Sequence, residues 1–436
     1  MYWGPLQRFT SYVRSSLWTV PLLAIPVAMI AVRLVHWLDG WGEWTLLGFG
    51  VTGAQTLLQA ATTAILSFLV FTFGSLLVAI QVASGQLTPR IIATTLLRDN
   101  VVRYTVGVFM FTFIFVQAAA DRIDSKVHQL PLFVAAGLTL ACFAAFLYLI
   151  DYAARLLRPI SILTRVGNEG LAVIKSVYPD PSLGPGFPKS QRRALALPER
   201  VIQHQGTSGI VLAVNLAELR SEAERSHGVI EFVPQVGDFV AVDEPLFNLY
   251  GGARTIEDDV LRSAVALGSE RTMEQDPTFA FRIVIDIALK ALSPAINDPT
   301  TAVLAIDQLN RLLRAVGTRH LRTDEVLDTS GQLRVIVRTP NWDDFVDLAF
   351  SEIRACGANN LQIVRRLRAM IENLNETLPG HRQRELQEQS TLLDHEIERL
   401  FRYPQERMLA GLADSQGLGG HSSKIKPARK RATRRT

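Results

Sequence analysis

Polar and small side chains follow one another at helical spacing inside an apolar stretch of the chain. They are Gln59, Thr63, Ser67, Gly74 and Gln81. Steps of three, four or seven residues place such side chains on one face of a helix. In a membrane this face can line a path for an ion or solute, because polar groups in hydrocarbon need water or a partner. It can also be a packing face, where small residues allow close approach and glutamines bond to a neighbouring helix. We favour packing, because no ionisable side chain lies midway along any apolar stretch.

Four apolar stretches supply the helices that would carry such a face. They are Leu17–Leu38, Leu57–Val82, Val101–Ala120 and Leu132–Tyr152, and crossing a hydrocarbon core takes about 20 residues. Arginines precede the first stretch, separate the second from the third and follow the fourth: Arg8, Arg14, Arg90, Arg98, Arg103, Arg155, Arg158 and Arg165. The positive-inside rule therefore predicts a multi-pass membrane protein with both termini in the cytoplasm.

Two polar runs outside the centres of these stretches are further candidate sites. Thr88-Pro89-Arg90 follows the second stretch, and Asn297-Asp298-Pro299-Thr300 lies in the soluble part. An aspartate before a proline is typical of a helix N-cap with proline at the first helical position. The Thr-Pro pair likewise suits a cap where the second helix leaves the bilayer, with the arginine at the headgroups. We therefore prefer a structural role for both runs over a ligand site.

Both runs also carry a resemblance to a known family. The first run is part of Gln81-Val-Ala-Ser-Gly-Gln-Leu-Thr-Pro-Arg90, which is followed by Leu97-Arg-Asp. The second is part of Ala291-Leu-Ser-Pro-Ala-Ile-Asn-Asp-Pro-Thr-Thr-Ala302, which is preceded by Glu270-Arg-Thr-Met-Glu-Gln-Asp276. Together they resemble the domain-of-unknown-function 2254 (DUF2254) family of predicted bacterial membrane proteins. The resemblance extends to about Tyr403. It departs in the first run, where the family has a Ser-Gln-Phe-Ser-Pro-Arg-like sequence. It implies a bacterial inner-membrane location and no particular activity.

Recognisable catalytic or cofactor motifs are absent from the sequence. It has no phosphate-binding Gly-Lys-Ser/Thr loop, no His-Glu-x-x-His helix and no dinucleotide-binding glycine motif. The two cysteines, Cys142 and Cys356, give no disulfide framework or thiolate metal site. An acidic cluster (Asp258, Asp259, Glu270, Glu274 and Asp276) could hold a cation, but its spacing matches no known cage and we prefer a solvated helix face. We therefore predict no enzyme, no metal and no cofactor.

The predicted fold is an α-helical membrane domain followed by a cytoplasmic α+β region. The expected parts are a membrane domain (1–155), a helical extension with a Pro/Gly linker (156–199), a β-rich module (200–252), a mainly helical domain (253–405) and a disordered basic tail (406–436). Strands are expected at 209–214, 229–234 and 333–337, and helices at 258–273, 278–292 and 300–316. Val236–Phe247 resembles the half-repeat of lipoyl- and biotinyl-type barrel-sandwich domains. No lysine lies between Lys189 and Lys290 to carry a cofactor, so we predict a structural or oligomer-forming module.

The net charge of +4 depends on the last thirteen residues, seven of which are basic. They are Lys424, Lys426, Arg429, Lys430, Arg431, Arg434 and Arg435. A nucleic-acid partner is not expected, because basicity indicates one when it covers a folded face. Anionic lipid headgroups are the expected partner of the tail.

The leading functional hypothesis is an oligomeric ion channel or transporter with a cytoplasmic assembly domain. It rests on the polar face of the second apolar stretch and implies a homo-oligomer in the lipid bilayer. The alternative hypothesis is a non-conducting membrane scaffold or sensor that displays a cytoplasmic interaction domain.

Overall fold

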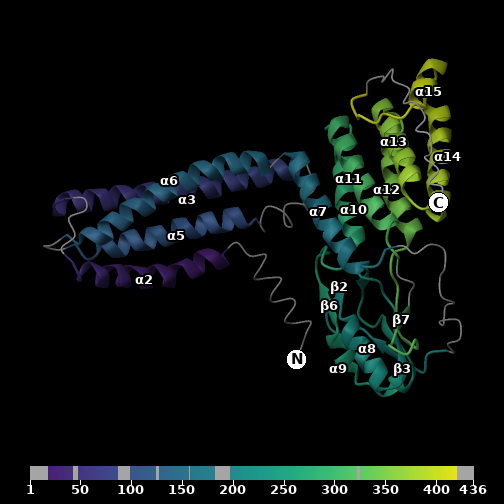
Figure 1. Ribbon diagram of the computed structural model, residues 1–436, viewed down its shortest axis with the longest axis horizontal. Coiled ribbons are helices and arrows are strands. Elements are labelled where there is room, and N and C mark those ends of the chain that lie inside the picture. Colours follow the sequence, from purple (N-terminus) through teal and green to yellow (C-terminus); the bar gives the residue numbers. More distant parts are fainter. Residues whose placement is uncertain are drawn as a thin grey trace, which may run out of the picture. The chain divides into compact units, whose positions relative to one another are not determined.

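The computed structural model describes residues 18–42, 48–86, 99–123, 127–156, 158–181, 197–321 and 325–419 (Figure 1). Its contacts divide the chain into two compact units, which meet in sequence between Ile162 and Leu163. The first is called the N-terminal unit and the second the C-terminal unit. The predicted run Thr88-Pro89-Arg90, most of the Pro/Gly linker and the basic residues of the tail lie outside the described residues.

The N-terminal unit is a bundle of four long helices that lie side by side (Figure 1). They are α2 (Thr19–Asp39), α3 (Val51–Gln86), α5 (Asn100–Ala120) and α6 (Gln129–Leu156). All four are long and apolar enough to cross a membrane, so the prediction of four long apolar helices is confirmed. At about 1.5 Å per residue, the 36 residues of α3 extend for about 54 Å, which exceeds a hydrocarbon core of about 30 Å.

Close contacts between small and aromatic residues hold the bundle together. A Cβ atom at Gly107 of α5 would lie 2.7 Å from a methyl carbon of Val20 in α2, so only glycine permits this approach. The ring of Phe68 stacks on that of Phe146, with centroids 4.5 Å apart. Helix packing in lipid relies on such shape complementarity, because the surrounding lipid tails remove most of the hydrophobic driving force.

Helix α7 (Pro159–Val177) begins with a proline, which suits the first turn because its missing N–H would have no helical partner. Its predicted apolar side is buried at Leu163, Val166 and Ile174. It packs against α10 (Pro277–Leu292) and α11 (Pro299–Gly317). At Gly170, an added Cβ would lie 2.7 Å from the Ala280 Cβ, so the glycine lets the two helices approach.

The β strands of the C-terminal unit form two sheets around one apolar core. The five-stranded sheet has the order β1-β5-β3-β8-β7, and the three-stranded sheet has the order β4-β2-β6. The strands are β1 (Arg200–Gln203), β2 (Gly209–Val214), β3 (Gly228–Phe232), β4 (Phe239–Val240), β5 (Pro245–Gly251), β6 (Val265–Gly268), β7 (Glu325–Leu327) and β8 (Leu333–Val337). Strands β3 and β8 are parallel, and the other pairs are antiparallel. Helix α8 (Leu216–Arg225) connects β2 to β3.

The helix predicted over 258–273 is wrong. Helix α9 covers only Asp258–Ser263, and β6 follows it after one residue. Val265 of β6 pairs with Val214 of β2, so burial against a neighbouring strand determines the structure of this short apolar run. Strands β6, β7 and β8 all lie beyond residue 252, so the sheets extend past the segment expected to be β-rich.

The remaining helices form the other layer of the C-terminal unit. After α10 and α11 come α12 (Trp342–Gly357), α13 (Leu361–Thr377), α14 (Gln383–Leu400) and α15 (Pro404–Ala410), with short 3-10 turns at Gly252–Thr255 and Gly380–Arg382. The stripe of apolar residues that predicts α13 is buried, including Val364, Leu367 and Leu374.

Two neighbouring arginines of α13, the buried Arg365 and the half-buried Arg366, hold the chain after α15, and we call this contact the C-terminal clamp. Arg365 donates from Nε to the Leu412 carbonyl (3.0 Å) and from Nη1 to the Gly419 carbonyl (2.9 Å). Arg366 donates to the carbonyl of Asp414 at 2.8 Å. The prediction of disorder from residue 406 onward is therefore wrong for 406–419, because side chains of α13 hold a segment whose composition alone suggests no fixed structure.

Candidate functional site

The polar face of α3 points away from its own bundle. Gln59, Thr63, Ser67, Gly74 and Gln81 are all exposed in the single chain. The buried positions of the same helix are Ala54, Leu58, Ala61, Ile65 and Thr72. At about 100° per residue, the two sets lie on opposite sides of the helix, about 180° apart. Within the part of the chain that the structure describes, these side chains are therefore on the side of α3 that is not packed against the other helices of the bundle.

Hydrogen bonding differs among the members of this face. The Thr63 hydroxyl donates to the Gln59 carbonyl at 3.0 Å, and the Ser67 hydroxyl donates to the Thr63 carbonyl at 2.8 Å. Both hydroxyls are thus satisfied by their own helix. The Gln59 carboxamide makes no hydrogen bond to any residue that the structure describes. It is the member of the face that most needs a partner outside the chain.

The depth of these side chains can be worked out from the helix geometry. The membrane-crossing part of α3 is Val51–Val78, with its centre between residues 64 and 65. At about 1.5 Å per residue, Gln59 lies about 8 Å from this centre, Thr63 about 2 Å and Ser67 about 4 Å. A hydrocarbon core reaches about 15 Å on each side of its midplane. These three side chains therefore belong in hydrocarbon, while Gln81 lies beyond it.

The predicted run at Asn297–Thr300 forms the turn between α10 and α11. Asp298 is the N-cap of α11 and accepts a hydrogen bond from the Thr301 N–H at 3.1 Å, with Pro299 in the first turn. The predicted cap is thus confirmed. Asn297 has φ +49°, a left-handed conformation that asparagine adopts more readily than most residues. Each of these residues has a local structural role in the helical hairpin.

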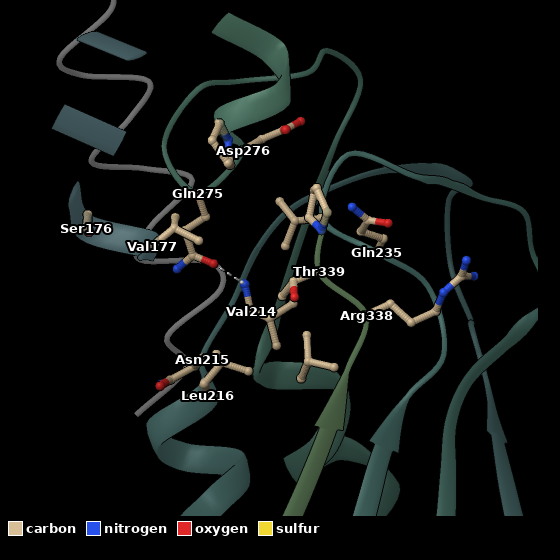
Figure 2. A pocket seen from close by; sticks show the side chains of 14 residues that line it. Ser176, Val177, Val214, Asn215, Leu216, Gln235, Gln275, Asp276, Arg338 and Thr339 are labelled. Atoms are coloured by element: carbon tan, nitrogen blue, oxygen red, sulfur yellow. Dashed lines mark hydrogen bonds between the residues drawn. The ribbon is translucent and has the colours of Figure 1, made fainter. Parts of the chain in front are cut away.

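A cavity of about 260 Å³ lies in the C-terminal unit, where several strands end (Figure 2). Its walls come from the ends of β2 and β8 and the residues after them, from the loop after β3, from the end of α7 and from the start of α10. The lining residues are Ser176, Val177, Val214, Asn215, Leu216, Gln235, Val236, Gln275, Asp276, Pro277, Val337, Arg338, Thr339 and Pro340. Loops after the carboxyl ends of parallel strands commonly form binding crevices, and β3 and β8 are such a pair.

The start of α10 forms one wall of this cavity. Gln275 accepts a hydrogen bond from the Val214 N–H at 2.9 Å, which ties the helix to the end of β2 (Figure 2). Asp276, which is 2% exposed, caps α10 by accepting from the Phe279 N–H at 3.2 Å. Its other oxygen pairs with the Arg271 guanidinium. The negative charge of this buried carboxylate is therefore compensated within the wall.

Gly237 permits the ion pair between Arg271 and Asp276. It has φ +95°, and a Cβ at this position would lie 2.3 Å from a guanidinium nitrogen of Arg271 and 2.6 Å from a carboxylate oxygen of Asp276. No side chain fits there without moving the pair. The glycine thus couples the turn after β3 to the start of α10.

The predicted acidic cluster does not come together as a cation site. Asp258 forms ion pairs with Arg200 and Arg262, whereas Asp276 pairs with Arg271. Across the described ranges, no group of three or more His, Cys, Asp or Glu side chains is placed to hold a metal ion. The sequence alone did not predict the cavity. Gln275 and Asp276, which line it, belong to the run Glu270–Asp276 that resembles the family. The signal that could have indicated the cavity is the presence of polar residues, such as Asn215 and Gln235, just after predicted strands.

Comparisons with known proteins agree with the membrane character of the chain. A family model described as "Predicted membrane protein (DUF2254)" matches residues 14–373. Similar curated proteins include uncharacterised proteins of Mycobacterium tuberculosis and Mycobacterium bovis. Each is 24% identical over 374 residues, which cover 80% of this chain and 69% of the relative. No solved structure matches significantly.

Proposed function

The chain belongs to the DUF2254 family of predicted membrane proteins. We propose that it acts as an oligomeric ion channel or transporter rather than as an enzyme. The observation that carries the proposal is the outward polar face of α3. In the assembled protein, the α3 helices of neighbouring copies would face one another, and the polar face would lie between subunits or along a central path.

The cost of leaving Gln59 in lipid supports assembly. An amide moved from water into a medium without hydrogen-bond partners costs about 2–7 kcal/mol. A partner on another helix recovers part of this, since hydrogen bonds between membrane helices contribute about 0.6–2 kcal/mol each. Water in a pore would satisfy the same group. A second copy of the chain would supply either one, and Gln59 has no hydrogen-bond partner among the described residues of this copy.

A membrane orientation forms part of the proposal. The arginines at the ends of the helices favour an inner-membrane protein with both termini in the cytoplasm, where the basic tail would meet anionic headgroups. Single cysteines introduced at Gly42 and Ser415, after Cys142 and Cys356 are replaced by serine, test this orientation. An impermeant thiol reagent outside the cell should label position 42 and spare position 415, and the opposite labelling would reverse the topology.

The rival function is a non-conducting membrane sensor or scaffold. The cavity in the C-terminal unit favours it, because a sensor needs a place for a ligand and no conduction path. In this case Gln59 would stabilise a dimer or larger assembly without lining a path.

Ion and solute flux in liposomes separates the two functions. We expect the wild-type protein to conduct, and a variant with Gln59, Thr63 and Ser67 all changed to leucine to lose most of the flux. Phe71→Leu is the matched control, because Phe71 is exposed on the same helix but flanks the polar face. Cross-linking in the same liposomes should capture more than one copy. Unchanged flux in the triple variant, or a protein that stays monomeric, would contradict the proposal.

A further inference from the structure

We infer that the cavity in the C-terminal unit is a binding site for a small organic anion, either a carboxylate or a phosphate ester. The inference is independent of the proposed channel function. It rests on which polar groups of the cavity are already used by the fold and which remain for a ligand.

The acceptor groups of the cavity wall are largely occupied. The two carboxylate oxygens of Asp276 accept from Arg271, Thr278 and the Phe279 N–H. Asn215 caps α8 by accepting from the Glu218 N–H at 3.2 Å, and its amide donates to the Glu218 carboxylate at 2.8 Å. These groups hold the two helix starts in place and have little capacity left for a ligand.

Donor groups remain on both sides of the cavity. Gln275 uses its side-chain oxygen for the Val214 N–H, which leaves its two amide N–H donors for a ligand. Figure 2 shows Gln275 and Asn215 on one side, and Gln235 and Arg338 on the other. The amide N–H groups of Gln275 and the guanidinium of Arg338 can donate to a ligand that carries acceptor oxygens.

Arg338 supplies a positive charge at the edge of the cavity, and its exposed side chain extends away from Gln275 (Figure 2). It is exposed, it directly follows β8, and no carboxylate of a described residue lies within ion-pair distance of it. Arg334 of the same strand shows the contrast, because it pairs with Asp328 at 2.8 Å. A guanidinium with five donors is well matched to a carboxylate or phosphate group. The charge of the cavity therefore favours an anion.

The apolar part of the wall and the volume limit the kind of anion. Val177, Val214, Leu216, Val236 and Val337 line the cavity and suit a carbon skeleton better than a bare inorganic ion. The volume of about 260 Å³ is just below the range of about 300–1,000 Å³ that is usual for drug-sized ligands. A metabolite-sized anion fits these limits, and an intact lipid does not.

Calorimetric titration of the full-length protein in nanodiscs tests the inference with four probes. They are succinate for the carboxylate class, adenosine monophosphate for the phosphate esters, adenosine as its neutral counterpart, and inorganic phosphate. We expect saturable binding of succinate or of adenosine monophosphate, with weaker binding of inorganic phosphate and none of adenosine. The anion that binds shows whether the site prefers a carboxylate or a phosphate ester.

Two variants connect the binding to the cavity. Arg338→Gln should weaken binding by about tenfold or more, because it removes a charge-assisted hydrogen bond. Gln275→Glu keeps an acceptor for the Val214 N–H but replaces the donors with a negative charge, so binding should be lost while the melting temperature is retained. Arg402→Gln, an exposed arginine outside the cavity, should bind like the wild type.

The inference is overturned by any of three results. The first is that neither succinate nor adenosine monophosphate binds. The second is that adenosine binds as tightly as its monophosphate and succinate does not bind. The third is that binding survives both Arg338→Gln and Gln275→Glu.

Discussion

The C-terminal clamp gives a quantitative prediction about where the folded protein ends. Arg365 is 2% exposed, and its guanidinium donates to the carbonyls of Leu412 and Gly419. A hydrogen bond from a charged donor contributes about 1.5–3 kcal/mol. Truncation after Ala410 removes both acceptors and leaves a buried cation without them, so we expect a loss of about 3–6 kcal/mol. This is a large share of the total stability of about 5–15 kcal/mol that is typical of a domain.

Thermal unfolding and amide hydrogen exchange measure this effect. Truncation after Ala410 should lower the unfolding temperature clearly, whereas deletion of Lys424–Thr436 should leave it unchanged, because that deletion spares the clamp. In full-length Arg365→Met, the amides of Gly417 and Gly419 should exchange faster, since their bonds to Asp414 (2.9 and 2.7 Å) depend on the ordered segment. Equal unfolding temperatures for the two truncations would refute the reasoning.

Substitutions at Asp298, Gly237 and Asp328 test local features of the C-terminal unit. Asp298→Asn should keep the cap of α11 and leave the melting temperature unchanged. Asp298→Ala should lower the free energy of unfolding by about 0.5–2 kcal/mol. A stable but inactive Asp298→Asn variant would show that the carboxylate has a functional role. Gly237→Ala should cost about 1–3 kcal/mol through backbone strain and the added contact. Gly206 has φ +103° and open space around it, so Gly206→Ala should cost less stability than Gly237→Ala. Equal melting temperatures for the two variants would show that the contact with Arg271 and Asp276 does not matter. Asp328 accepts hydrogen bonds from the Ser330 hydroxyl, two backbone N–H groups and Arg334, which hold the pKa of its carboxyl well below the usual range. Its contribution to stability should be complete above the unfolded-state pKa of about 3.9 and should be lost as the pH falls from there through the folded-state pKa. Asp328→Asn should therefore flatten the acid side of the stability curve, and an unchanged slope would contradict this.

Features determined by local sequence were predictable. The four long apolar helices could be predicted because each apolar stretch has about the 20 residues that a membrane-crossing helix needs. A helix also satisfies all backbone hydrogen bonds within the stretch itself. The strand Gly209–Val214 and the cap at Asp298 were also predicted, because β-branched residues and an Asp-Pro pair act within a few residues of themselves.

Features that depend on distant contacts were not predictable. Strand β6 exists because Val265 and Ala266 pair with β2, about 50 residues earlier in the chain. The cavity combines five short segments that are far apart in sequence, and none of them has a distinctive composition. The segment after α15 is rich in glycine and serine, and a buried arginine of α13 orders it. In each case the partner that decides the structure lies outside any local window.

The hydroxyl groups of α3 also have a mechanical consequence. Thr56, Thr63 and Ser67 each donate to the carbonyl four residues earlier, at 2.8–3.0 Å, and all three lie on the outward face. A carbonyl that accepts both a hydroxyl and a backbone N–H holds the helix less tightly, and such bonds often bend helices. Because these shared carbonyls follow one side of the helix, α3 should bend more easily in one plane than in any other. The polar face of α3 is therefore also the side on which the helix is most compliant.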